Sequence, residues 1–277
     1  MKRTFDCSGR LFWGRQYYLS IRREKGLCGL TLVLGHDYDE RCSQNQAGRT
    51  ELPTRKRSKG NGMDSETFVR ELEASNQAVL AKIAGGEETV EKPTAELQQL
   101  LQVALNNEIS VSELAAAWMP TTRETDVKVA LAQQTGDEAN HFSLIEGRLN
   151  ALNISTTNYE APGLNPLFAY LRSLETTVER IAAGQFTLES IAYRVNERFM
   201  KYCEALGDQE TVKLYQRRIQ PDELHHHKLG KQLLEKYAVT PEAQERARAA
   251  AAKTLEIAQQ VRLLATQKLG TSCFPGC

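Results

Sequence analysis

The chain has 277 residues, of which 41% are hydrophobic and 25% are charged, and this is the composition of a soluble globular protein. Lysine plus arginine and aspartate plus glutamate both number 35, so the formal net charge is zero. No apolar run approaches the roughly 18–20 residues that a membrane span needs. These numbers exclude a membrane-spanning protein, and they argue against nucleic acid as a partner of the whole chain.

Six cysteines are scattered along the chain, and none of them belongs to a C-x-x-C pair. They are Cys7, Cys28, Cys42, Cys203, Cys273 and Cys277. This pattern argues against a disulfide framework and against a zinc ribbon. Free thiols fit a reducing compartment, so we expect a cytoplasmic protein.

Residues 1–62 differ from the rest of the chain in charge and in pattern. They hold 13 Lys/Arg against 6 Asp/Glu, whereas residues 63–277 hold 22 against 29. They also show no sustained hydrophobic period. Two interpretations stay open: a basic, partly disordered arm for nucleic acid or a partner, or a non-native extension upstream of a true start at Met63. The change of pattern at Met63 favours the second.

Residues 63–93 predict one helix followed by a linker. In MDSETFVRELEASNQAVLAKI the apolar residues Phe68, Leu72, Val79 and Ile83 recur on one side of a helix. The glycines and charges of residues 85–93 then form the linker. We therefore expect a short amphipathic helix that precedes the main domain.

Four helices are predicted between residues 94 and 238, and their connections indicate the fold. They are expected at about 94–119, 125–152, 167–206 and 210–238. Thr94 is a good N-cap for the first, and the third is expected to break near Gly184. Short connections join the members of each pair, and a long irregular segment crosses between the pairs. This layout predicts an all-α four-helix bundle of two hairpins with one crossover.

Residues 239–277 are predicted to form a C-terminal helix and tail. Thr240 and Pro241 cap and start this helix, which is Ala-rich and runs to Gly270. Together with the helix after Met63, it flanks the bundle. Its alanine run is helix-forming composition and indicates no function.

The strongest functional signal is a duplicated E-x-x-H motif. GDEANHF places Glu138 three residues before His141, and PDELHHH places Glu223 three residues before His226. Residues at i and i+3 share a helix face, so each pair can hold one metal ion. Asp137 and Asp222 precede the two glutamates. The alternative is a lattice of surface salt bridges, which does not explain the duplication.

Each hairpin should donate a further carboxylate from its first helix. On the first helix, Glu108 lies on the apolar stripe and Glu113 does not. On the third helix, Glu189 lies on the stripe, although Glu197 aligns with Glu113 if the repeat is stretched by one residue. A glutamate on an inner stripe is costly unless it meets a cation, so Glu108 and Glu189 are the predicted ligands.

One glutamate followed by E-x-x-H, twice over on four helices, resembles the ferritin-like di-iron carboxylate superfamily. The resemblance covers roughly residues 94–238 and implies a ferritin-like bundle with two Fe ions, or Mn/Fe. The implied ligands are Glu108, Glu138, His141, Glu189, Glu223 and His226. In that superfamily the aspartate before each glutamate bonds a ligand histidine across the site, which makes Asp137 and Asp222 orienting groups.

Differences between this sequence and known members of the superfamily reduce the number of functions to consider. The radical tyrosine of ribonucleotide reductase small subunits is replaced by Ile145, and the C-x-x-C iron centre of rubrerythrins is absent. Where hydroxylases place a threonine, Tyr193 stands as a candidate catalytic residue, redox-active or hydrogen-bonding, or as simple packing. His225 and His227 point away from the ligand face and are expected to be solvated or to support the ligands.

The resemblance implies an oxidoreductase that activates O₂ to oxidise or hydroxylate a small organic substrate. It implies a reductase or another electron donor as a partner, and we expect a homodimer. The alternative function is an iron-binding ferroxidase or storage protein without an organic substrate. A third hypothesis is a structural subunit that has lost its metal, against which the intact ligand set argues.

Overall fold

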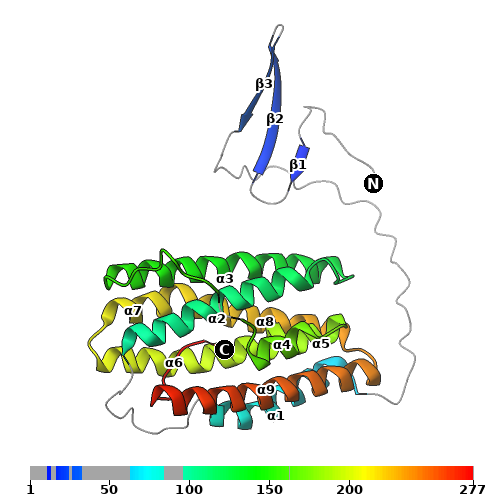
Figure 1. Ribbon diagram of the computed structural model, residues 1–277. Helices are drawn as coiled ribbons and strands as arrows, with labels where there is room; N and C mark the ends of the chain where they lie inside the picture. The colour runs from blue at the N-terminus through cyan, green and yellow to red at the C-terminus, as the bar shows by residue number, and fades with distance from the viewer. Residues whose placement is uncertain are drawn as a thin grey trace. The chain divides into compact units, whose positions relative to one another are not determined.

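The computed structural model describes residues 11–13, 17–24, 27–32, 63–83, 96–161 and 163–276. The chain divides into two units, Met1–Ser58 and Lys59–Cys277, which are treated one at a time below (Figure 1). The expected cap at Thr94 and the linker at 85–93 lie outside the described residues. Most of residues 1–62 lie outside them too. The choice between a basic arm and a non-native extension for these residues therefore also lies outside the described part of the chain.

The described residues of the first unit form a small antiparallel sheet with the strand order β1-β2-β3. The strands are β1 Leu11–Trp13, β2 Tyr17–Glu24 and β3 Leu27–Leu32. Leu11 pairs with Leu19, and Glu24 pairs with Leu27. Aromatic and aliphatic residues in these strands suit a pleated surface. The sequence pattern predicted no strand here, because alternation is not sustained.

The second unit is all-α in the residues that the structure describes. Its α-helices are α1 Ser65–Ile83, α2 Leu97–Trp118, α3 Thr125–Ala151, α4 Pro166–Arg172, α5 Thr177–Ile181, α6 Glu189–Ala205, α7 Gln209–Leu214, α8 Gln220–Tyr237 and α9 Pro241–Leu269. Two π-helical segments, η1 Ala182–Leu188 and η2 Tyr215–Ile219, lead into α6 and α8. The all-α helical bundle expected from the sequence is confirmed.

The third expected helix is interrupted before Gly184 and not at it. Thr176 begins α5 with a capping box, in which its hydroxyl accepts from the Glu179 N–H and the Glu179 carboxylate accepts from the Thr176 N–H. Gly184 lies inside η1, where an added Cβ would be 2.8 Å from the Trp118 ring. The T-x-x-E cap therefore restarts the helix, and the glycine serves close packing.

Two helix hairpins and an outer helix pair build the bundle (Figure 1). The first hairpin is α2 with α3, and the second is α6 with α7 and α8. The outer pair, α1 and α9, packs on η1 and α8, so the second hairpin lies between the first hairpin and this pair. Among the described residues, no helix is long and apolar enough to span a bilayer.

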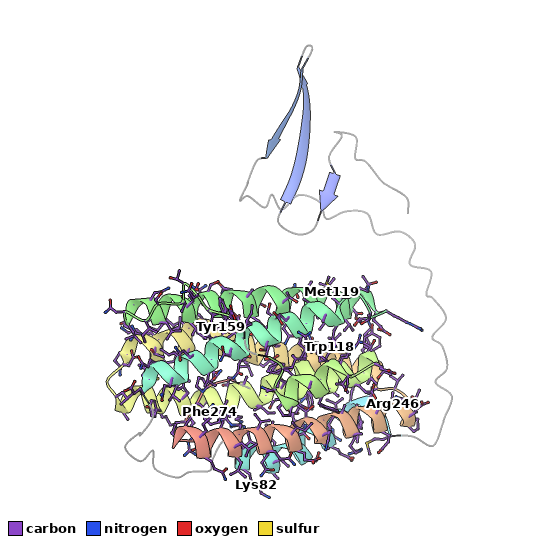
Figure 2. All side chains as sticks on the ribbon, in the orientation of Figure 1. Lys82, Trp118, Met119, Tyr159, Arg246 and Phe274 are labelled. Carbon is purple, nitrogen blue, oxygen red and sulfur yellow. The ribbon has the colours of Figure 1, made fainter. Side chains whose placement is uncertain are left out.

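Two clusters of buried apolar side chains fill the bundle. Figure 2 labels one member of each: Trp118 belongs to the first cluster and Phe274 to the second. Along α2, Leu105 belongs to the second cluster and Val111 to the first, and the buried Glu108 lies between them. The same change of cluster occurs along α3, and it also occurs from η2 into α8, where Ile219 belongs to the second cluster and Leu233 to the first. A layer of buried polar residues is therefore enclosed by apolar side chains on both sides.

Candidate metal centre

The six predicted ligands meet in this polar layer. They are Glu108 from α2, Glu138 and His141 from α3, Glu189 from α6, and Glu223 and His226 from α8. Each of these side chains belongs to a residue that is at most 4% exposed. Burial of four carboxylates is costly unless positive charge compensates them, so the cluster needs a cation or protons.

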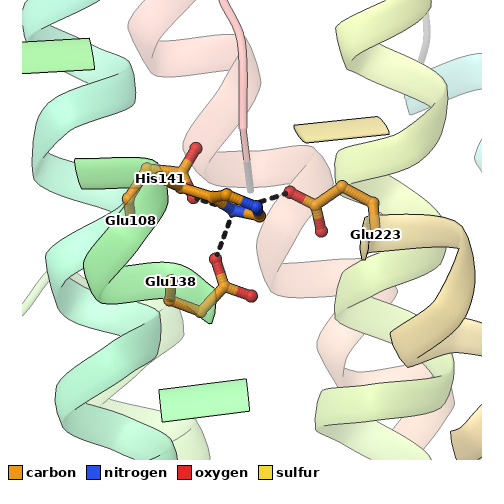
Figure 3. Close-up of side chains that lie close together, drawn as sticks. All are labelled: Glu108, Glu138, His141 and Glu223. Carbon is orange, nitrogen blue, oxygen red and sulfur yellow. Dashed lines mark hydrogen bonds and ion pairs between the residues drawn. The ribbon is translucent and has the colours of Figure 1, made fainter. Parts of the chain in front are cut away.

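Their ligand atoms form two overlapping groups, of which Figure 3 shows the first. One group is Glu108, Glu138, His141 and Glu223, and the other is Glu138, Glu189, Glu223 and His226. Within a group, one atom from each residue lies within 4.8 Å of the others. Glu138 and Glu223 belong to both groups. Two neighbouring ions would therefore share these two carboxylates.

The two histidines have the same orientation toward the cluster. Nδ1 of His141 lies 3.2 Å from Glu138 Oε2 and 3.4 Å from Glu108 Oε2. Nδ1 of His226 lies 3.2 Å from Oε1 of the same Glu138. Glu138 therefore stands between the two imidazoles, with one oxygen toward each.

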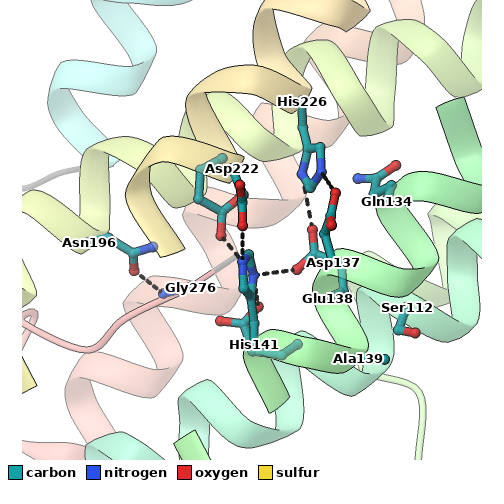
Figure 4. Close-up of polar contacts among 12 residues, drawn as sticks. Ser112, Gln134, Asp137, Glu138, Ala139, His141, Asn196, Asp222, His226 and Gly276 are labelled. Atoms are coloured by element: carbon teal, nitrogen blue, oxygen red, sulfur yellow. Dashed lines mark hydrogen bonds and ion pairs between the residues drawn. The ribbon is translucent and has the colours of Figure 1, made fainter. Parts of the chain in front are cut away.

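Each Nε2 faces an aspartate of the opposite hairpin (Figure 4). Nε2 of His141 lies 3.1 Å from Asp222 Oδ2, and Nε2 of His226 lies 3.1 Å from Asp137 Oδ2. An N–H at Nε2 that donates to a carboxylate leaves Nδ1 as the atom that can ligate a metal. Asp137 and Asp222 thus lie where groups that fix the imidazole rings would lie.

Gln134 holds one of the carboxylates, and the sequence analysis did not identify it. It is 2% exposed and lies one turn before Glu138 on α3. Its side-chain Nε2 donates to Oε1 of Glu189 on α6. An amide of the first hairpin therefore orients a carboxylate of the second. The only sequence signal was a glutamine at i−4 from the motif, on the same helix face.

Burial and mutual repulsion favour protons on three of the glutamates. Desolvation, together with the charge of Glu138, raises the pKa of Glu108 from 4.5 to about 7. The same two causes raise the pKa of Glu189 to about 8 and that of Glu223 well above its ordinary value. A cation that binds here near neutral pH must therefore displace protons.

The pKa of Glu138 is lowered and not raised, because both histidines point at this carboxylate. Burial alone would raise the pKa of Glu138, but His141 and His226 hold it far below its ordinary value. Burial would lower the pKa of His226, but Asp137 and Glu138 outweigh that and raise it to about 10. Glu108 and Glu138 likewise raise the pKa of His141 well above its usual range. Without metal, imidazolium charge supplies the compensation that divalent ions would provide.

Unpaired atoms in the cluster fit a pair of divalent ions. Among the described residues, Glu138 Oε1, Glu223 Oε2 and His226 Nδ1 are buried and have no hydrogen-bond partner. The 3.2 Å contact between His226 Nδ1 and Glu138 Oε1 is not aligned as a hydrogen bond. Buried polar atoms normally have a partner. Four carboxylates and two neutral imidazoles would also balance two divalent ions, with ligands that suit iron and manganese.

Both helices of the second hairpin carry a π-helical segment next to the cluster. η1 ends one residue before Glu189, and η2 ends four residues before Glu223. Such segments are rare and are frequently found at functional sites. Gly230 lets α8 approach η1, since an added Cβ would be 2.6 Å from the Gln185 carbonyl carbon. His227 adds a contact, with Nδ1 2.7 Å from the carbonyl oxygen of Phe186 in η1.

The other candidate residues lie outside the cluster. Glu113 is exposed, and its carboxylate is 3.0 Å from Arg172. The Glu197 side chain is 42% exposed and pairs with Arg194 on its own helix. Tyr193 is half-buried and does not line the cavity described next, and His225 is exposed. Of the two carboxylates considered on each helix, the structure brings Glu108 and Glu189 to the histidines.

A cavity of about 10 Å³ lies among the carboxylates. Four glutamates line it, together with side chains of α2 and α6 and with Gly276 of the C-terminal tail. This volume suffices for about one water molecule. The tail carries no metal-ligand motif, so no sequence pattern associated it with the site.

Comparison with known proteins supports the helical fold but gives no information on the carboxylate–histidine cluster. No family model matches the chain, and no curated protein matches it. An X-ray structure of a TenA homologue from Pyrococcus furiosus is similar, with a TM-score of 0.52 and 16% sequence identity over 70% of this chain and 97% of that chain. At this identity the similarity shows a shared helical fold and says nothing of activity.

Proposed function

We propose that this protein is a ferritin-like di-iron (or Mn/Fe) carboxylate protein that activates O₂ to oxidise or hydroxylate a small organic substrate. The observation that carries the proposal is the pair of overlapping ligand groups that share Glu138 and Glu223. The crossed contacts from Asp137 to His226 and from Asp222 to His141 support it. Surface salt bridges would not bury these groups.

The chemistry divides between the ions and the chain. Two such ions, when bound, would supply electrons for the reduction of O₂. An electron-donor protein would then reduce the oxidised ions again. Four glutamates would neutralise the charge of the ions, and Gln134 would keep Glu189 turned toward them. The apolar clusters on both sides of the layer exclude bulk water from it.

The alternative, a ferroxidase or storage-type protein without an organic substrate, is favoured by one observation. The cavity of about 10 Å³ among the carboxylates has no room for an organic molecule. Both functions require the same metal centre. They differ in whether the wall of this cavity opens.

Metal analysis tests the centre common to both functions. The protein, loaded anaerobically with Fe²⁺ and desalted, is expected to hold about two irons per chain and to consume O₂. Glu108→Gln and Glu189→Gln are expected to lower the iron content, since each removes a ligand of one group. The matched controls are Glu113→Gln on α2 and Glu197→Gln on α6, because both glutamates point away from the cluster.

The result that would overturn the proposal is equally specific. Glu138→Ala removes a carboxylate that belongs to both groups, so it is expected to abolish binding of both ions. If this variant folds, as circular dichroism would show, and still binds two irons per chain, the cluster is not the metal centre. A wild-type protein that binds iron but reduces no O₂ would leave a binding role only.

A further inference from the structure

We propose that the C-terminal segment 271–276 is a displaceable plug that controls access to the carboxylate–histidine cluster. This inference rests on the proposed metal centre and adds to it a gate for ions and substrate. The segment follows Gly270, which ends α9 in the left-handed conformation at φ 69° and turns the chain back toward the bundle. Residues 273–276 are buried although they form no helix.

The end of this segment forms part of the cavity wall. Gly276 lines the same cavity as the four glutamates. The other lining residues belong to α2, α3, α6 and α8, whose backbones are fixed by helical hydrogen bonds. Because a molecule larger than water cannot enter about 10 Å³, part of the wall must move. The segment is the only non-helical part of this wall among the described residues.

Polar side chains of the bundle hold the segment chiefly through hydrogen bonds to its backbone groups. The Arg262 guanidinium donates to the carbonyl oxygens of Ser272, Phe274 and Gly276 at 3.1–3.3 Å. Asn107 on α2 donates to the Pro275 carbonyl at 3.3 Å, and Asn196 on α6 accepts from the Gly276 N–H at 2.9 Å (Figure 4). Water can replace such bonds, so the segment can leave while the helices stay folded.

Two contacts give the closed position its specificity. The Arg262 guanidinium lies 4.0 Å from the centre of the Phe274 ring, which is buried in the second apolar cluster. Gly276 has φ 75°, and a Cβ added there would be 2.6 Å from Asn107 Nδ2. Glycine is therefore favoured at this position, because its left-handed backbone conformation strains residues with a side chain and an added Cβ would have to displace the Asn107 amide.

Gly276→Ala tests the plug without a change in any ligand. The new Cβ meets Asn107, so the segment is expected to spend more time displaced. The variant should bind the same number of Fe²⁺ ions at equilibrium but should lose them to an anaerobic chelator about tenfold faster, as expected from the loss of one or two hydrogen bonds. Gly207→Ala is the matched control: it has the same left-handed strain at φ 79°, but nothing lies within 4 Å of its Cβ position.

A metal-independent measurement accompanies the first. Hydrogen exchange of the backbone amide at position 276, which Asn196 holds in the closed position, is expected to accelerate in Gly276→Ala and not in Gly207→Ala. If Gly276→Ala leaves this amide protected, Arg262→Gln is combined with it to free the three carbonyls. Wild-type iron release from a variant with an exposed segment would overturn the plug. Failure of the wild-type protein to bind iron would instead overturn the proposed metal centre.

Discussion

Asp222 on α8 lies 3.1 Å from Nε2 of His141 on α3, although the two residues are 81 positions apart in the chain. The mirror contact joins Asp137 to His226 over the same distance. Each hairpin therefore supplies a histidine whose Nδ1 faces the buried glutamates, and an aspartate that contacts the histidine of the other hairpin. These two contacts are the most direct link between the duplicated motif and the chemistry of the layer.

The crossed aspartates are expected to tune metal affinity. Asp222→Asn preserves the size of the side chain but weakens the acceptor for His141, so iron affinity should fall by about 10- to 100-fold. Asp137→Asn should have a similar effect through His226. Competition with a chelator of known affinity measures the change. Unchanged affinity in both variants would show that the aspartates are only surface groups.

The metal-free protein is expected to lose stability as the pH rises from about 5 to about 8. Groups whose pKa is raised in the folded state bind protons more tightly there than in the unfolded state. Their contribution to the free energy of unfolding is therefore lost as the pH rises from the pKa of the unfolded state to that of the folded state. For Glu108 and Glu189 these folded pKa values are about 7 and about 8, against an ordinary 4.5. The rise for His226, from 6.5 to about 10, acts in the same direction above pH 6.5.

Thermal unfolding over this pH range, with and without bound metal, checks the expectation. Bound divalent ions replace the protons, so the metal-loaded protein should show a smaller decline in Tm. Glu108→Gln should flatten the curve of the metal-free protein because it removes one titrating group. A metal-free Tm that increases between about pH 5 and about pH 8 would contradict the assignment of protonated carboxyls.

Gly230→Ala is expected to destabilise the bundle by about 1–3 kcal/mol, because the new Cβ would overlap the η1 backbone. Gly147→Ala in α3 is the control. Its Cβ position has nothing within 4 Å, so the better helix propensity should stabilise the protein by about 0.5–1 kcal/mol. Urea unfolding measures both. Equal effects would mean that α8 and η1 can separate without cost.

Tyr215→Phe is expected to leave the protein as stable as the wild type or to stabilise it by about 1 kcal/mol. The Tyr215 hydroxyl is buried and has no hydrogen-bond partner among the described residues. Burial, with the charges of Glu108 and Glu223, raises the pKa of this phenol well above its ordinary value. Removal of the hydroxyl thus relieves an unpaired polar group.

Tyr237→Phe gives the opposite test. The hydroxyl of Tyr237 donates to Asp126 Oδ1 at 2.6 Å, so its loss should destabilise the protein by about 0.5–1.5 kcal/mol. The sign of the difference between the two variants, measured by urea unfolding, is the decisive quantity. If Tyr215→Phe is the more destabilising change, its hydroxyl has a bonding role in the folded protein.

Local signals predicted the helices and the position of the main acidic residues. Proline and threonine at the start of α9 and the left-handed Gly270 at its end mark its bounds, because caps act over a few residues. The helical period placed Glu108 on the inner face and Glu113 on the outer face. Such features depend on residues close in sequence, which is why they could be inferred from one chain.

Features that depend on distant contacts were not predictable in this way. Nothing local marks Gln134 as the partner of Glu189, 55 residues later. The contact from Asn107 to Pro275 spans 168 residues and involves a segment without any period. The two π-helical segments also left no sequence pattern from which they could be predicted. These three features depend on tertiary contacts, which local sequence patterns do not predict.

Because Glu138 and Glu223 belong to both ligand groups, the two metal positions are expected to fill cooperatively. The first ion would already hold two of the four side chains that the second ion needs. The entropy of ordering those side chains is then lost once for two ions, which favours fully loaded and empty molecules over half-loaded ones. A chain limited in iron would partition between these two populations and would carry few molecules with a single, incompletely coordinated ion.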